Sequence, residues 1–168
     1  MREMLREYDL IGVNMAVQRH AGALPHWIPG EMMWKEWFMW EPFLGTDGIC
    51  GTLNPMQAYT HRIVRRILDD LNRGRMDELE RCLASSRVFA LEELLMPTLA
   101  LRAGGRPRPY PAHTAAFTRA GEYLSLPELA QARSNPGVFF VHPVRRDLQD
   151  AVWSSIIEGD QLPFGFPE

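Results

Sequence analysis

Lysine is almost absent from this chain of 168 residues, since Lys35 is the single lysine among its 18 lysines and arginines. Nearly every cation is therefore an arginine, whose planar guanidinium suits contact with phosphate or carboxylate. The net charge is −3. A weakly acidic chain has no general electrostatic attraction to nucleic acid or to an acidic membrane surface, so we expect no nucleic-acid partner.

Cysteine is also scarce. Cys50 and Cys82 are the two cysteines, and they form no CxxC motif, which argues against a zinc ribbon or finger. Two reduced, partly buried thiols are typical of a cytosolic chain. No apolar run approaches the length that spans a bilayer, and the N-terminal "MREMLREYDL" lacks the pattern of a signal peptide. We therefore expect a cytoplasmic protein without a transmembrane segment.

Several catalytic motifs are missing as well. The sequence contains no glycine-rich phosphate loop of either common type, no GxSxG, no HExxH and no DxD. The histidines at positions 20, 26, 61 and 113 show no metal-ligand spacing. A complete doubly wound nucleotide-binding domain is therefore not indicated.

The hydrophobic pattern predicts a mixed α/β domain, with α+β as the alternative, over residues 1–168. Few strands and four or so helices are expected, with 104–113 as a proline-rich connector. Asn54 is predicted as an N-cap with Pro55 at the first helical position. Pro97 is expected to kink or end its helix.

Gly74 is expected to stop the helix predicted at 54–75. Ser125 and Glu128 have the spacing of a capping box. The predicted elements are strands at 8–17 and 138–142, and helical segments at 54–75, 76–84, 85–105, 125–133 and 147–158. Residues 31–40 are expected to form either a helix or, because prolines and glycines flank them, a loop.

Four tryptophans fall within residues 27–40, among prolines, glycines and methionines. Aromatic faces stack on sugar rings, and the indole nitrogen donates a hydrogen bond. Together with nearby acidic residues, this cluster could line a carbohydrate site. The alternatives are a packed core or a protein-contact surface. The tryptophans are Trp27, Trp34, Trp37 and Trp40.

Glu92 and Glu93 precede Pro97 in "ALEELLMPTLA". Adjacent carboxylates on a helix point about 100° apart, so one of them could face a site. A carboxylate beside a proline-broken helix could act as a general base that takes a proton from an attacking hydroxyl. The alternative is a pair of solvated surface glutamates.

His142 ends the apolar run "VFFVHP", and Arg145 and Arg146 follow it. A neutral imidazole at the end of a strand could ligate manganese or a similar ion. The arginines could pair with phosphate oxygens. A histidine at the edge of the core, followed by surface arginines in ordinary salt bridges, is the alternative.

The order of these motifs resembles the second, acceptor-binding half of bacterial GT-A-type glycosyltransferases. The matching segments are "YDLIGVN", "HWIPGEMMWKEW", "HRIVRRIL", "EELLMPTLALRAGG" and "FFVHPVRRDL", which span roughly residues 8 to 148. The resemblance implies that Glu93 is the general base, with Glu92 as the second candidate. It also implies that His142 completes the shell of a catalytic Mn²⁺ or Mg²⁺, and that Trp34 and Trp37 lie near the acceptor. Glu93 and His142 are therefore expected to point into one shared cleft.

This chain departs from the family pattern in one respect. We expect the half that binds the nucleotide sugar, with its DxD motif, to be absent. The predicted function is therefore the acceptor-side portion of a glycosyltransferase, which moves a sugar to a glycan or lipid-linked hydroxyl and is incomplete alone. Its expected partners are a carbohydrate acceptor and a separate donor-binding domain or a second copy. The alternative is a non-enzymatic bacterial or phage protein of inhibitor or immunity type that binds a partner through residues 27–44. A stand-alone carbohydrate-binding module is a third reading.

Overall fold

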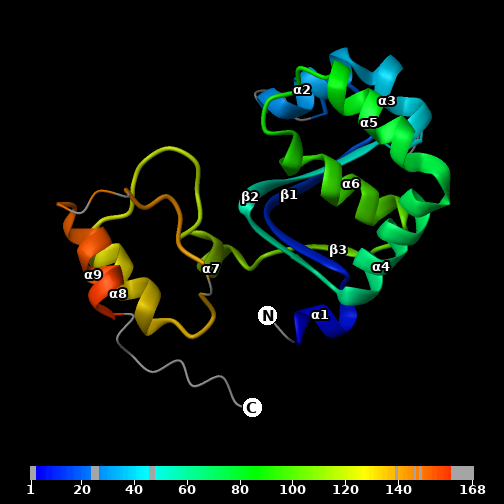
Figure 1. Ribbon diagram of the computed structural model, residues 1–168. Helices are drawn as coiled ribbons and strands as arrows, with labels where there is room; N and C mark the ends of the chain where they lie inside the picture. The colour runs from blue at the N-terminus through cyan, green and yellow to red at the C-terminus, as the bar shows by residue number, and fades with distance from the viewer. Residues whose placement is uncertain are drawn as a thin grey trace. The chain divides into compact units, whose positions relative to one another are not determined.

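The computed structural model describes residues 3–23, 27–45, 48–138, 140–145, 147 and 149–159. The chain has the mixed α/β composition that the sequence predicts (Figure 1). Its contacts group it into two compact units, Met1–Tyr110 and Pro111–Glu168. A single domain over residues 1–168 therefore stays a prediction.

The first unit is built on a three-stranded mixed sheet in the order β2-β1-β3. The central strand β1 (Leu10–Gln18) pairs antiparallel with β2 (Ile49–Tyr59) and parallel with the short strand β3 (Pro107–Pro109). The first residues of β1 form an apolar run and are buried, as expected for a central strand. The strand predicted at 8–17 is thus confirmed.

The pairing of β1 with β2 is interrupted by a bulge. Gly12 pairs with Gln57 while the next residue, Val13, pairs with Leu53, so residues 54–56 have no partner on β1. Gly12 is needed here, because a Cβ at this position would lie 2.0 Å from the Thr52 hydroxyl oxygen. That hydroxyl donates a 2.7 Å hydrogen bond to the carbonyl of Val13, which holds the strands together beside the bulge.

The helix predicted at 54–75 begins later than expected. Residues 54–59 belong to β2, and α4 (His61–Asp70) starts after Thr60, whose hydroxyl accepts a hydrogen bond from the Ile63 amide at 3.3 Å. Asn54 is therefore not the N-cap and Pro55 is not the first helical residue. Ladder pairing with β1 keeps residues 57–59 extended. Asn54, which precedes a proline, is biased toward extended backbone by its own position.

Gly74 interrupts the helical chain, as predicted. It has φ 101° within a π-helical stretch, Leu71–Arg75, and α5 (Met76–Ser85) follows. The next prediction is wrong: a single helix over 85–105 does not form. Ala90 is left-handed, a 3₁₀ turn covers Leu91–Glu93, and α6 begins only at Leu95.

Helix α6 (Leu95–Arg102) carries Pro97 without a break, which corrects the expected kink. Pro97 lies in the first turn, where an amide would have no intrahelical acceptor. The Thr98 hydroxyl accepts from the Cys50 amide at 3.0 Å and donates to the Cys50 carbonyl at 3.1 Å. These bonds fasten α6 to β2. Figure 1 shows α6 alongside the sheet, and α6 also contacts α3 and α4.

The tryptophan-rich segment is helical but divided. Helices α2 (Ile28–Lys35) and α3 (Trp37–Leu44) meet at Glu36, whose carboxylate accepts from the Ser86 hydroxyl at 2.7 Å and from the Arg87 amide at 2.9 Å. No helix among the described residues is both long and apolar enough to cross a lipid bilayer. The core between these helices, the sheet and α4–α6 includes Leu10, Met33, Trp40, Phe43, Leu44, Ile49, Ile63, Ile67, Leu94 and Leu99.

Asp9 joins the three strand regions of this unit. Its buried carboxylate accepts hydrogen bonds from the Thr60 hydroxyl at 3.0 Å, from Arg62 at 2.5 Å and from the Arg106 amide at 3.1 Å. Burial raises the pKa of Asp9, but these hydrogen bonds and the Arg62 charge outweigh it, and the pKa is lowered overall. Part of the expected connector 104–113 is thereby held at the sheet edge as β3, where prolines are tolerated.

The second unit contains α7 (Ala112–Ala115), α8 (Leu126–Ser134) and α9 (Ala151–Gly159). The capping box predicted for α8 is present between Ser125 and Glu128. A small core of Phe117, Leu124 and Ala132 packs with three valines. The helix predicted at 147–158 is confirmed from residue 151.

The strand predicted at 138–142 is wrong for the residues described. Only an isolated parallel bridge joins Thr118 to His142, and Phe140 is 40% exposed. The backbone of His142 accepts from the Arg119 amide and donates to the Phe117 carbonyl, each at 2.9 Å. An apolar run without a neighbouring strand thus becomes an extended segment that lies along a loop.

We predict that Asp9→Asn lowers the free energy of unfolding at pH 7 by about 2–3 kcal/mol, because it removes buried, charge-assisted hydrogen bonds. The pKa of Asp9 is lower in the folded state. Its stabilisation is therefore present above the unfolded value of 3.8 and is lost as the pH falls through the folded pKa. Urea denaturation at pH 7 and pH 3 measures both effects, with the exposed Asp69→Asn as control. Equal midpoints for wild type and Asp9→Asn at pH 7 would contradict this role.

Candidate functional site

Glu93 is a buried carboxylate, 9% exposed, that faces the bulge of β2. Its Oε1 accepts a hydrogen bond from the Asn54 amide at 3.3 Å, and the Trp27 indole donates a second one to the same carboxylate. The bulge leaves Asn54 without a ladder partner on β1, so Glu93 satisfies a backbone donor that would otherwise lack an acceptor. Glu93 and Trp27, two residues singled out from the sequence, are therefore brought together.

Burial raises the pKa of Glu93 above its usual range. The hydrogen bonds from Asn54 and Trp27 act in the opposite direction, and the neighbouring charge of Glu92 raises the pKa further. The net upward shift moves this carboxyl toward the neutral range, where a general base works best. The site thus combines a tuned carboxylate with an indole.

Glu92 is exposed beside Glu93 and takes part in the same network. Its Oε1 accepts from the Asn54 side-chain amide at 3.4 Å, and its backbone carbonyl accepts from Gln57 at 3.2 Å. The Tyr59 hydroxyl donates to the Gln57 side-chain oxygen at 2.6 Å. Burial, with a smaller effect of Cys50, raises the pKa of Tyr59, which keeps the phenol a hydrogen-bond donor. Polar groups of β2 therefore surround the carboxylate pair.

Glycines in β2 and α2 make room for the Trp27 ring. A Cβ on Gly51 would lie 1.5 Å from the Cη2 atom of Trp27, and one on Gly30 would lie 2.8 Å from its Cε3 atom. The indole therefore rests directly on the backbone of the strand, from which its N–H reaches Glu93.

The other tryptophans differ in their surroundings. Trp34 and Trp37 are half-buried, with ring centroids 4.8 Å apart and planes tilted by 49°. The Trp34 indole donates to the buried side-chain oxygen of Gln18 at 3.0 Å. Trp40 is completely buried against Phe43. Its predicted role in substrate binding is corrected to a role in the core.

His142 lies in the second unit. Its Nδ1 is 2.9 Å from the Arg119 carbonyl, and since a carbonyl can only accept, Nδ1 carries the proton. Nε2 is then the only ring atom left to bind a metal. No group of three or more metal-ligating side chains occurs in the described parts of the chain. One imidazole nitrogen does not fit Mn²⁺ or Mg²⁺, which prefer several oxygen ligands.

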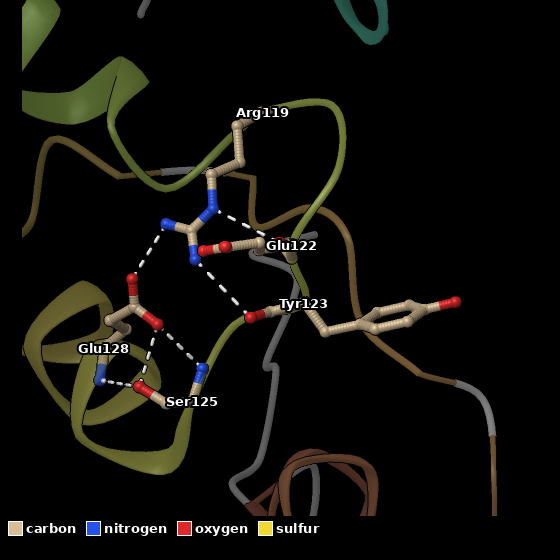
Figure 2. A network of polar contacts seen from close by, with 5 residues as sticks. All are labelled: Arg119, Glu122, Tyr123, Ser125 and Glu128. Carbon is tan, nitrogen blue, oxygen red and sulfur yellow. Dashed lines mark hydrogen bonds and ion pairs between the residues drawn. The ribbon is translucent and has the colours of Figure 1, made fainter.

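Arg145 also lies in the second unit, exposed, with its guanidinium 5.1 Å from the centre of the Tyr123 ring. Arg146 is outside the described residues. Figure 2 shows the neighbouring network, in which Arg119 donates to Glu128 at 2.8 Å and to the carbonyls of Glu122 and Tyr123. Hydrogen bonds from Arg119, and then from Ser125, lower the pKa of Glu128 to about 2. These contacts hold residues 119–128 together.

Because Glu93 belongs to the first unit and His142 to the second, their convergence on one cleft stays a prediction. Within the first unit, sequence reasoning missed Asn54 and Gln57 as partners of the carboxylates, since both were placed on a helix. The dipeptide Asn54–Pro55 was the available signal, because a residue before proline favours extended backbone.

Comparison with models of protein families, with curated proteins and with solved structures finds no match to this chain. The resemblance to GT-A-type glycosyltransferases therefore stays an expectation from the sequence motifs alone.

We predict that Glu93→Gln gains stability relative to wild type as the pH rises. A carboxyl whose pKa is raised by folding binds more protons when folded, so wild-type stability falls as the pH rises from 4.5 through the folded pKa. Glutamine keeps an acceptor oxygen and does not ionise. Denaturant titrations between pH 4 and pH 8 measure the difference, with Glu92→Gln at the exposed neighbour as control. A difference between wild type and Glu93→Gln that does not change with pH would refute the argument.

Proposed function

We propose that this chain is the acceptor-side portion of a glycosyltransferase, with Glu93 as the general base. The observation that carries the proposal is the buried, hydrogen-bonded carboxylate of raised pKa beside the Trp27 indole. A base of this kind could take the proton from an acceptor hydroxyl as the sugar is transferred. Indole faces suit sugar rings, which matches a carbohydrate acceptor.

Several residues around Glu93 have roles in the proposed site. Trp27 and the Asn54 amide hold the Glu93 carboxylate in place, and Glu92 lies beside it as the second candidate base. Trp34 and Trp37 are the remaining candidates for acceptor contact. A Mn²⁺ or Mg²⁺ ion would need oxygen ligands from a separate donor-binding domain, and no step proposed here runs through it. The chain is therefore expected to be incomplete alone, with a donor-binding domain or a second copy as partner.

The proposal is tested in cell extract from a strain of the source organism in which the gene for this chain is deleted. Purified wild-type protein should restore transfer of radiolabel from nucleotide sugars to glycan or lipid in that extract. Glu93→Gln should lower the restored rate at least about 100-fold, as expected for loss of a general base. Glu92→Gln is the matched control and should lower it less than about tenfold. The proposal fails if wild-type protein restores nothing with any donor sugar, or if Glu93→Gln supports the full rate.

A second candidate function is partner binding without chemistry, through residues 27–44. It is favoured by Phe38 and Ile28, which are 80% and 61% exposed on the outer side of α3 and α2. Exposed large apolar side chains are typical of protein contact surfaces. This candidate corresponds to an inhibitor- or immunity-type protein.

Phe38→Ser should weaken binding of such a partner at least about 30-fold while leaving the fold intact, because an exposed aromatic anchor contributes to the contact and not to the core. Tagged wild-type protein and Phe38→Ser are compared as baits in host extract after cross-linking. Leu126→Ser, which removes an apolar side chain 44% exposed in the second unit, is the matched control. Retention of the same proteins by all three baits would exclude this surface.

A further inference from the structure

A pocket of about 270 Å³ lies in the first unit, where the C-terminal ends of α4 and α6 meet. Its floor is apolar and is formed by Ile67, Leu99 and Ala103, of which Ile67 and Leu99 are each 4% exposed. Its rim is charged. The rim residues are Arg66, Asp69, Asp70, Arg73 and Arg102.

The helical repeat places most of the rim on one face. Arg66, Asp69, Asp70 and Arg73 are spaced by three, four and seven residues, which aligns them along one side of α4 and the turn after it. Arg73 has φ −79° and ψ 21°, next to Gly74 at φ 101°, so the backbone leaves the helix at this point. The interruption of the helix that Gly74 permits therefore determines where the Arg73 guanidinium lies.

The charges of the rim are only partly neutralised inside the protein. Asp70 is paired with Arg75 at 2.7 Å. Arg66 donates to the Ala103 carbonyl at 3.3 Å through one of its guanidinium nitrogens, which leaves its other donors available. Within the described part of the chain, the guanidinium of Arg73 has neither a hydrogen bond nor an ion pair. At least one rim guanidinium is thus available for an external anion.

The net charge around the pocket is positive although the chain as a whole has a charge of −3. Three guanidiniums and two carboxylates line it, which gives a net charge of +1. A phosphate monoester carries a charge of about −1.5 to −2 near neutral pH and offers three acceptor oxygens, so a positively charged rim attracts it. The guanidiniums are those of Arg66, Arg73 and Arg102, and the carboxylates are those of Asp69 and Asp70.

We propose that this pocket binds a small organic phosphate, whose phosphate group contacts Arg73 and Arg66 and whose uncharged body covers the apolar floor. The volume is close to the lower end of small-molecule sites, which suits a sugar phosphate or a nucleoside monophosphate. Arginine forks hold phosphate oxygens in pairs, which gives the site direction as well as charge. The proposal is independent of the role given to Glu93, because neither Glu93 nor Trp27 lines the pocket.

Isothermal titration calorimetry at low salt tests the proposal with three probes: inorganic phosphate, glucose 1-phosphate and uridine monophosphate. At least one organic phosphate should bind more tightly than inorganic phosphate, because only an organic body covers the floor. Arg73→Gln and Arg66→Gln should each weaken that binding by about fivefold or more, as for a partly exposed charge pair. Asp69→Asn should tighten it by about threefold, because it removes a like charge from the rim.

Arg65→Gln is the matched control, since Arg65 lies on α4 next to Arg66 but outside the pocket lining, and it should bind within about twofold of wild type. Glu93→Gln should bind as wild type does, which separates this test from that of the proposed function. The proposal is overturned if none of the three probes binds at millimolar concentration, or if the Arg73 and Arg65 variants bind equally well. Equal affinity for inorganic and organic phosphate would overturn the role of the apolar floor.

Discussion

The hydrogen bonds that Asp9 accepts are the constraint on which the first unit depends. One buried carboxylate joins the start of β1 to the β2–α4 junction and to the entry of β3, through residues up to 97 positions away in the sequence. With these points fixed, Tyr59 pairs with Leu10 and Pro107 pairs with the same residue from the other side. The pairing register along β1 is then set, and so is the place where β2 must bulge.

The bulge explains why a carboxylate lies where it does. It leaves the Asn54 amide without a ladder partner, and Glu93 supplies the acceptor at the cost of burying a group that ionises. An amide side chain could fill the same structural role without a raised pKa. Burial of an ionisable group costs stability, and such a cost is typical of functional sites because stability and activity are often in conflict.

The sequence predicted those elements whose signals are local. The apolar run of β1, the stop at Gly74 and the capping box of Ser125 all depend on neighbours within a few residues, and all are present. Strand β2 was missed because its pairing with β1 is long-range, and its asparagine and proline favour turns. The same limit applies to the site. Glu93 and Trp27 could be named as candidates, but the contact of Glu93 with Asn54 depends on a bulge that only strand pairing creates, and Trp27 reaches Glu93 from its place over Gly51 of β2.

Helix α6 keeps the two proposed sites of the first unit apart. It begins two residues after Glu93, whereas the pocket is lined by Leu99, Arg102 and Ala103, in and just after its second half. The two hydrogen bonds between Thr98 and Cys50 prevent the helix from sliding along β2, so this spacing is fixed. Neither Glu93 nor Trp27 lines the pocket, so the proposed phosphate binding and the proposed base use different side chains. Either property can therefore be lost without the other.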